Sequence, residues 1–198
     1  MVAEHASATE AQQSEARQRL IDVAEALFYR KGIRAVGVDE VIAAAQVAKA
    51  TLYRHFGSKE QLVNAYLERR GRFSRTKLTE SSACSDDPRE QILEAFRDLE
   101  KNLENPSFRG CAFLLAVSEH GELESVRSIS RDHKLFVRDH FATLAQKAGL
   151  SDPLFADQLA LIYEGALATI VVRPDAHPGS TALALVRSLL GTFGGGQR

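Results

Sequence analysis

Apolar residues recur every three to four positions along most of this 198-residue chain, a spacing that predicts a succession of amphipathic α-helices. The first begins near Ser14 and ends at Gly32, and its apolar face carries Leu20, Val23, Ala24, Leu27 and Phe28. Two later segments, 154–172 and 181–193, are apolar on nearly all sides. Each of them therefore needs cover from two directions.

The stretch 38–59, VDEVIAAAQVAKATLYRHFGSK, predicts two short helices joined by a tight turn. Val41, Ile42 and Ala45 share the inward face of the first helix, and Leu52 and Phe56 that of the second. The other side chains of the second helix are cationic, hydroxyl-bearing or aromatic: Lys49, Thr51, Tyr53, Arg54 and His55. A short helix crossed by a second, with outward side chains free for base edges and phosphates, is the helix-turn-helix geometry for the DNA major groove.

This run, continued to VDEVIAAAQVAKATLYRHFGSKEQLV and preceded by FYRKGIRAVG, resembles the tetracycline-repressor (TetR) family of bacterial transcription regulators. The resemblance is detailed over about the first third of the chain; beyond Tyr66 only the length and the helical layout are similar. It implies an all-α fold of about nine helices. An N-terminal three-helix helix-turn-helix domain would bind DNA, and a C-terminal helical domain would bind a ligand and dimerise.

Three positions in this run depart from the usual family pattern. Gln46 lies in the turn and Ala50 inside the second helix where Gly is common, and Ala48 takes the cap position where Ser is common. Gln46 is expected to adopt a left-handed conformation, at a cost of about 1 kcal/mol. Ala48 cannot cap the helix, which costs about 1 kcal/mol, whereas Ala50 recovers a similar amount as a better helix former than Gly.

The outward side chains of the two helices, with the first turn of the next helix, are the expected contacts to DNA. They are Val38, Gln46, Lys49, Thr51, Tyr53, Arg54, His55 and Lys59. An aromatic residue at helical spacing more often belongs to the core, but Leu52 and Phe56 already supply that face. For Lys59, which lies beside the exposed amide groups of a helix N-terminus, the alternative to phosphate binding is a solvated side chain.

Breaks in the pattern predict four segments. Residues 1–13 are small and polar and are expected to be disordered; 14–57 form the helix-turn-helix domain; 58–80 form a connecting helix; and 81–198 form the ligand-binding and dimerisation domain. The polar segment SSACSDDP separates the last two. Within it, Asp87 is expected to cap a helix and Pro88 to occupy that helix's first position.

Charge is unevenly divided along the chain. Residues 1–78 contain 13 Lys and Arg against 9 Asp and Glu, a net +4, while residues 79–198 contain 12 against 17, a net −5. A basic N-terminal region attached to an acidic body suits phosphate binding at one end, although scatter of surface charge would give a similar split.

The composition indicates a cytoplasmic protein without a membrane span. No apolar run approaches the ~20 residues needed to cross a bilayer, and the N-terminal MVAEHASATEAQQ lacks the basic start and apolar stretch of a signal peptide. Cys84 and Cys111 are too few for a disulfide framework and are expected to be free thiols. No phosphate-cradling glycine loop, serine-nucleophile elbow or zinc-protease motif is present, so no catalytic residue and no cofactor is expected.

The two apolar helices near the C-terminus are expected to form a four-helix interface in a homodimer, as the resemblance implies. The interface set is Ala160, Tyr163, Leu167, Val171, Leu183, Val186 and Leu190. The alternative is that these residues pack inside one subunit. A symmetric operator favours the dimer, because it requires two recognition helices about one DNA turn, ~34 Å, apart.

Aromatic and aliphatic residues of the second domain could line a cavity for a small-molecule effector. The expected lining is Phe96, Phe113, Val117, His133, Phe136 and Tyr163. The alternative for most of them is ordinary core packing, and for His133 a buried neutral ring bonded to a carboxylate or carbonyl. No metal site is expected, since His133 and His140 are seven positions apart and would lie about 10 Å apart along a helix.

These observations favour a DNA-binding transcriptional regulator, a repressor that binds a palindromic operator as a homodimer and is released by an unknown small-molecule effector. The partners would be double-stranded operator DNA, the effector and a second copy, with no membrane. A non-enzymatic role is expected. The rival hypotheses are a helical small-molecule-binding enzyme, which would need a convergent set of titratable groups, and an interaction module without sequence-specific DNA binding.

Overall fold

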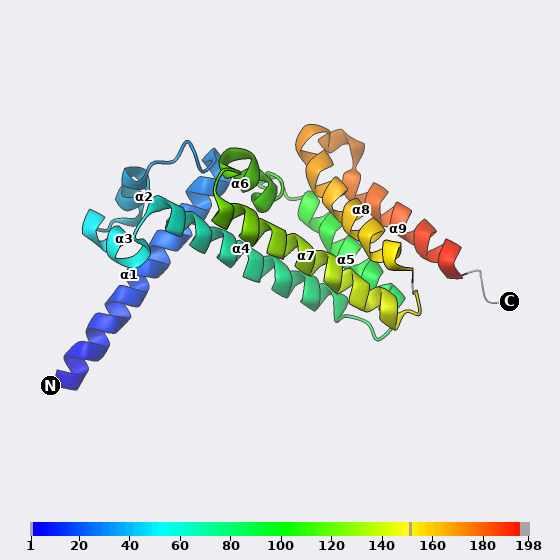
Figure 1. The fold of residues 1–198 in the computed structure, drawn as a ribbon, viewed down its shortest axis with the longest axis horizontal. Coiled ribbons are helices and arrows are strands. Elements are labelled where there is room, and N and C mark those ends of the chain that lie inside the picture. Colours follow the sequence, from blue (N-terminus) through cyan, green and yellow to red (C-terminus); the bar gives the residue numbers. More distant parts are fainter. Residues whose placement is uncertain (1, 151, 195–198) are drawn as a thin grey trace. The chain divides into compact units, whose positions relative to one another are not determined.

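The structure, a computed structural model, describes residues 2–150 and 152–194. Within those residues it has nine α-helices, one short 3₁₀ helix and no strand, which confirms the expected all-α class (Figure 1). The elements are α1 (Val2–Lys31), α2 (Val38–Ala45), α3 (Lys49–Phe56), α4 (Lys59–Ser82), α5 (Pro88–Leu103), α6 (Ala112–His120), α7 (Glu124–Lys147), α8 (Pro153–Val172), η1 (Pro174–Ala176) and α9 (Pro178–Gly194).

Helix α1 is longer than the sequence pattern predicts, because it begins at Val2 and not near Ser14. The segment 2–13, expected to be disordered, is therefore part of a helix. From Val2 to Lys31 the chain contains neither Gly nor Pro and is rich in the helix formers Ala, Glu and Gln. The helix ends at Gly32, whose φ of 91° closes the last turn as expected.

Two later helices begin with a capping Asp followed by Pro, as the sequence predicts for the first of them. Asp87 accepts a hydrogen bond from the backbone N–H two residues further on, and Pro88 is the first residue of α5. Asp152 and Pro153 do the same for α8. In both cases a side-chain oxygen satisfies one of the unpaired N–H groups at the helix start, and Pro occupies a position where no N–H is needed.

The chain forms two compact units. The first unit holds the chain up to Arg70 together with Ala112–Ser130, and the second holds Gly71–Cys111 and the chain from Arg131 onward. Helices α4 and α7 each contribute residues to both. The division differs from the expected boundaries, because α6 and the first turns of α7 belong to the first unit, with the helix-turn-helix.

The first unit is built on α1, which packs against both α2 and α3. Val41 and Ala45 of α2 and Leu52 and Phe56 of α3 are buried, as the apolar pattern predicts. Ile42, expected to face inward with them, is only half-buried. The rest of the core comes from α1, from α4 and from α6, whose buried residues include Leu20, Phe28, Leu62, Tyr66 and Phe113.

The second unit has its core where α9 packs against α5 and α8 (Figure 1). Three aromatic rings meet in it: Phe96 stacks on Phe141 with ring centroids 5.4 Å apart. The Tyr163 ring lies edge-on to Phe96 at 5.7 Å and tilted against Phe141 at 5.8 Å. Aromatic pairs in these geometries add about 0.5–1.5 kcal/mol each beyond area burial.

Helix α8 is more apolar than the sequence reading allowed. In the described part of the chain it is the one helix whose length and composition would also suit a bilayer span, with a mean hydropathy of 1.4 over its most apolar 18 residues. Its sequence is nevertheless interrupted by Asp157 and Glu164, so no uninterrupted apolar run reaches this length. Two carboxylates of α8 pair with α7: Asp157 with Arg138 at 2.9 Å and Glu164 with Lys134 at 3.4 Å.

Candidate nucleic-acid interface

The turn between α2 and α3 has the strained conformation expected of it. Gln46 has φ 54° and ψ 46°, the left-handed region, and so caps the C-terminus of α2. The N–H groups of Gln46 and Val47 donate to the carbonyls of Ala43 and Ile42 at 3.2 and 3.3 Å. These bonds satisfy carbonyls that the end of a helix would otherwise leave unpaired.

Helix α3 has no side-chain cap at its N-terminus. Ala48 is the cap residue in an extended conformation, and, as its sequence predicts, its side chain makes no hydrogen bond. Thr51 donates its backbone N–H to the Ala48 carbonyl at 2.9 Å. Within the described residues, the amide groups at the very start of α3 thus have no side-chain acceptor, and exposed amides of this kind suit an anion.

The outer face of α3 is polar and accessible. Lys49, Tyr53 and Arg54 are exposed, with Tyr53 at 42% of its full accessibility, while Thr51 and His55 are half-buried. Of the residues at the starts of neighbouring helices, Val38 is half-buried and Gln46 exposed. The helix therefore divides as expected, with Leu52 and Phe56 inward and the candidate contacts outward.

Carboxylates of α2 compensate part of this positive charge. Lys49 donates to Asp39 with Nζ and Oδ1 3.0 Å apart, and that hydrogen bond raises the pKa of Lys49. Lys31 of α1 similarly reaches Glu40 at 2.6 Å. These pairs are exposed and contribute little to stability. They leave Arg54 as the exposed cation of α3 without a carboxylate partner within the described chain.

His55 is held at the edge of the core. Its ring lies 6.4 Å from that of Phe56, and its Nε2 is buried without a hydrogen bond in the described structure. Burial lowers the pKa of His55, and the nearby charges of Arg54 and Arg17 lower it further. Arg17 of α1 lies over the Phe56 ring, with its guanidinium carbon 5.2 Å from the ring centroid. His55 and Thr51 are thus the half-buried candidates of α3, whereas Lys49, Tyr53 and Arg54 are exposed.

A concave surface lies where α1 meets the turn and α3. Its volume is about 310 Å³, and its lining consists of Gln13, Ala16, Arg19, Gln46, Val47, Ala48, Thr51 and Arg54. Arg19 from α1 and Arg54 from α3 are both exposed and approach it from different helices. Two guanidinium groups beside the uncapped start of α3 form a surface with the charge and donors for a phosphate.

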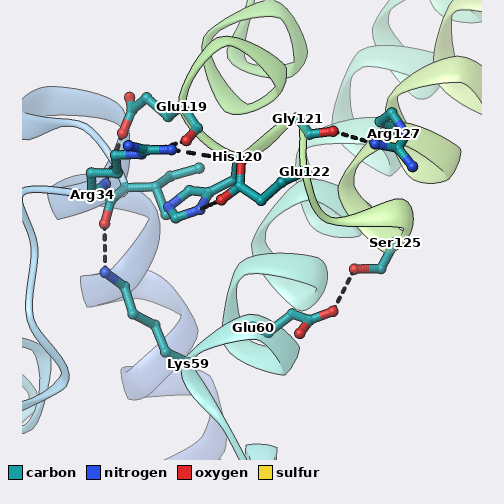
Figure 2. A network of polar contacts seen from close by, with 10 residues as sticks. Arg34, Lys59, Glu60, Glu119, His120, Gly121, Glu122, Ser125 and Arg127 are labelled. Carbon is teal, nitrogen blue, oxygen red and sulfur yellow. Dashed lines mark hydrogen bonds and ion pairs between the residues drawn. The ribbon is translucent and has the colours of Figure 1, made fainter.

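Lys59 does not extend into solvent. Its ammonium donates to the backbone carbonyl of Ile33 at 2.7 Å, as Figure 2 shows. Burial lowers the pKa of Lys59, and Glu119 opposes that shift. The preceding Ser58 accepts from the N–H of Gln61 at 3.1 Å and so caps the start of α4. In this conformation the side chain of Lys59 supports the α1–α2 connection, and its proposed contact to DNA would have to come from the remaining N–H groups.

The ligand-binding candidates are divided between the two units. Phe96, His133, Phe136 and Tyr163 belong to the second unit, whereas Phe113 and Val117 belong to the first. Phe96 and Tyr163 pack in the aromatic cluster described above, and burial raises the pKa of Tyr163. A cavity of about 340 Å³ in the second unit is lined by other residues: Glu100, Leu103, Glu104, Asn105, Pro106, Phe108, Ile170, Pro174, His177, Pro178, Gly179 and Ser180.

Phe136 and His140 form a separate stack on α7. The guanidinium of Arg75 lies 4.7 Å above the Phe136 ring, and the His140 ring stacks on its neighbour with centroids 6.2 Å apart. His140 Nε2 lies 2.8 Å from Oγ of the buried Ser82. Burial lowers the pKa of His140, with a smaller effect from Lys147. His140 is thus half-buried and paired with a hydroxyl, whereas the alternative considered from the sequence was a buried neutral histidine bonded to a carboxylate or carbonyl.

Four of the residues expected at a dimer interface are instead buried within the subunit. Ala160, Leu183, Val186 and Leu190 are at most 8% exposed. Leu183, Val186 and Leu190 belong to the core cluster of the second unit, and Tyr163 and Leu167 pack partly against it. Only Val171, at 53%, is largely exposed. The spacing of apolar residues on α8 and α9 does not say which side of each helix faces the core, so the expected interface set includes residues that a single subunit already buries.

Other large apolar residues of α8 and α9 are exposed in the single subunit. On α8, Leu161 is 74% and Val172 80% exposed, and the small residues Gly165 and Ala168 lie between them on the same stripe. On α9, Leu185 is 53% exposed. The stripe on α8 from Leu161 to Val172 is a candidate contact surface, because contiguous exposed apolar surface marks interaction sites.

The chain is similar in sequence and in structure to bacterial transcriptional regulators. The family model described as bacterial regulatory proteins of the tetR family matches residues 20–66. The crystal structure of SCO4454, a TetR-family transcriptional regulator from Streptomyces coelicolor, is 34% identical, with a TM-score of 0.85 over 91% of this chain and 96% of that one. The HTH-type transcriptional regulator Rv1255c of Mycobacterium tuberculosis is 36% identical over 78 residues, 39% of each chain.

A third relative has a named activity. The HTH-type transcriptional repressor KstR2 of Rhodococcus jostii is 41% identical over 51 residues, which is 26% of this chain and 25% of that protein. The chain thus matches about two fifths or less of the length of these two curated relatives, and SCO4454 extends the likeness to nearly the whole of it.

Proposed function

Because this chain belongs to the TetR family of transcriptional regulators, with a DNA-binding helix-turn-helix domain, we propose that it is a homodimeric repressor of its own operator. The observation that carries the proposal is the outer face of α3, where Tyr53 and Arg54 are exposed while the inward face is fully used by the core. A recognition helix needs this division, since only side chains free of packing can reach base edges.

The contacts we propose fall into two groups. Gln46, Thr51, Tyr53 and Arg54 would read or approach the bases. Val38, Lys49, His55 and Lys59 would lie nearer the phosphates, and Lys49 would exchange Asp39 for a phosphate. The concave surface between Arg19 and Arg54 supports a backbone contact there as well, because phosphate contacts fix the register in which a helix enters the groove.

The homodimer we propose uses the exposed faces of α8 and α9. Leu161, Val172 and Leu185 would be buried against a second copy, and Gly165 and Ala168 would let the helices approach closely. Val171 is the member of the expected interface set that this face retains. Two copies related by a two-fold axis would present two recognition helices, as a palindromic operator requires.

Release by a small-molecule effector follows from the family and is the second part of the proposal. An effector that prefers the conformation with mis-spaced recognition helices would weaken DNA binding by its differential affinity for the two states. Phe96, Phe113, Val117, His133, Phe136 and Tyr163 stay candidates for its site. Since operator DNA is the partner, the proposed location is the cytoplasm.

A gel-shift titration tests the DNA-binding claim. Purified protein is titrated against a duplex from the region upstream of its own gene and against a scrambled duplex of the same length and composition, both at 0.15 M salt. We expect at least a hundredfold preference for the upstream duplex, because specific sites are typically bound 10³-fold or more tighter than random DNA. Equal binding to both duplexes would remove the regulator proposal.

Repression itself is tested by a reporter driven by the same upstream region. Expression is expected to rise when the gene is deleted and to fall again when it is restored. A KstR2-like repressor gives this result, whereas an activator gives the opposite. A variant with an intact fold but with Tyr53→Ala and Arg54→Ala should behave as the deletion.

A further inference from the structure

The connection between α1 and α2 is held by a residue of α6, within the first unit (Figure 2). Glu119 lies in the last turn of α6, and its carboxylate accepts the backbone N–H of Arg34 with N and Oε2 2.7 Å apart. The backbone carbonyl of Glu119 accepts a second hydrogen bond from the Arg34 guanidinium. Arg34 is thus bound through both its backbone and its side chain by one residue that follows it by 85 positions.

Gly32 shows how closely the carboxylate approaches the backbone. Its φ is +91°, and a Cβ added there would lie 2.9 Å from Oε1 of Glu119. Real Cβ atoms essentially never come so near another heavy atom, so a side chain at this position would push the carboxylate away. A side chain at position 32 would therefore be strained by the positive φ and would displace the Glu119 carboxylate from its present place.

The same connection is supported from α4. Lys59 donates to the carbonyl of Ile33 at 2.7 Å, and Glu60 accepts from the hydroxyl of Ser125 at 2.8 Å (Figure 2). The first turns of α4 and α7 are thereby joined beside the Glu119 contact. Three successive residues, from Gly32 to Arg34, are fixed by α6 and α4 together.

We propose that Glu119 is a positioning residue for DNA binding, which fixes the α1–α2 connection and thereby α2, on which the recognition helix depends. Helix α2 begins at Val38, and its cap residue Gly37 makes no side-chain hydrogen bond, so the start of α2 has no cap of its own. A binding surface must be held within about 0.5 Å by the residues behind it. This inference rests on the proposed DNA-binding function.

The first test uses the free full-length protein and amide hydrogen exchange. In Glu119→Ala, the amide of Arg34 loses its acceptor, so we expect its exchange to become at least tenfold faster, with faster exchange also along α2. Glu119→Gln keeps an acceptor oxygen and should stay close to the wild type. Glu68→Ala, which removes an exposed carboxylate of α4 in the same unit, is the matched control and should change neither. Unchanged exchange at Arg34 and α2 in Glu119→Ala would overturn the proposal.

The second test measures affinity for the operator duplex at a temperature well below melting. We expect Glu119→Ala to weaken binding about tenfold while the scrambled duplex is bound as before, and Glu119→Gln and Glu68→Ala to bind as the wild type does. Loss of affinity that only follows the unfolded fraction, measured by chemical denaturation, would mean a purely structural role and would overturn the positioning claim. If the wild type itself shows no preference for the operator, the proposed function fails, and the exchange experiment still decides whether Glu119 holds α2.

Gly32→Ala supplies a check on the contact itself. Its methyl group would meet the carboxylate in the wild type and would find that space empty in Glu119→Ala. We expect Gly32→Ala to accelerate exchange along α2 more in the wild-type background than in the Glu119→Ala background. Equal effects in both backgrounds would contradict a direct contact in solution.

Discussion

Substitution of Leu161 by Glu should separate the proposed dimer into folded monomers. Leu161 is 74% exposed in the single chain, so its removal creates no cavity in the subunit. Full burial of a leucine side chain contributes about 1.5–3 kcal/mol, and about three quarters of that would be gained when a second copy covers this one.

A two-fold interface contains each substitution twice. The lost burial therefore amounts to about 2–4 kcal/mol per dimer, and each 1.4 kcal/mol is tenfold in affinity. The two introduced carboxylates would also lose water on association, which adds to the cost. We expect the dimer dissociation constant to rise at least about a hundredfold, while the helical content of the monomer stays unchanged.

Sedimentation equilibrium over a range of concentrations measures this constant, and far-ultraviolet circular dichroism reports the fold. Leu135→Glu is the matched control: it places the same charge at a leucine of α7 that is 51% exposed but lies on another helix. The control should dimerise as the wild type does. A Leu161→Glu protein that dimerises as tightly as the wild type, or a wild type that is monomeric at tens of micromolar, would refute the reasoning.

Three further changes have expected outcomes. Tyr53→Ala with Arg54→Ala should reduce operator affinity by at least about tenfold, measured by fluorescence anisotropy. The slope of log affinity against log salt concentration should become shallower by about 0.9, for one lost phosphate contact. Undiminished affinity would show that the recognition face lies elsewhere. Gln46→Gly should raise the unfolding free energy by roughly 0.5–1 kcal/mol, because φ 54° costs a residue with a Cβ but not Gly; a lower value in urea titration would contradict that strain. Burial lowers the pKa of His140 below 6.5, so as the pH falls the unfolded chain takes up the proton of this histidine before the folded chain does. The contribution of neutral His140 to the unfolding free energy is therefore fully present above pH 6.5 and is lost below it, by at most about 1.4 kcal/mol per pH unit. His140→Gln should flatten that pH dependence, measured by denaturation at pH 5–7.

Much of the DNA-binding unit was predictable because its determinants are local. The inward face of α3 follows from the spacing of Leu52 and Phe56, and the left-handed Gln46 follows from its place in a two-helix turn. The caps at Asp87 and Asp152 likewise involve residues two positions apart. Interactions of this range are contained in short stretches of sequence, so pattern and side-chain chemistry are enough to find them.

The errors concern features that depend on distant parts of the chain. Helix α9 has two apolar stripes, and only its packing on α5 and α8 decides that Val186 faces the core and Leu185 the solvent. The inward turn of Lys59 depends on Ile33, and the place of α6 depends on Glu119 meeting Arg34. Contacts between residues so far apart in the sequence leave no pattern in either stretch that would predict them.

The most direct test of sequence-specific binding by a dimer is a footprint of the region upstream of the gene, with full-length protein at 0.15 M salt. Two protected half-sites of a palindrome should appear, with centres about one DNA turn, ~34 Å, apart, and both should become protected at the same protein concentration. Uniform weak protection along the fragment, or a single half-site without a symmetric partner, would contradict the proposal that two copies of α3 read one operator.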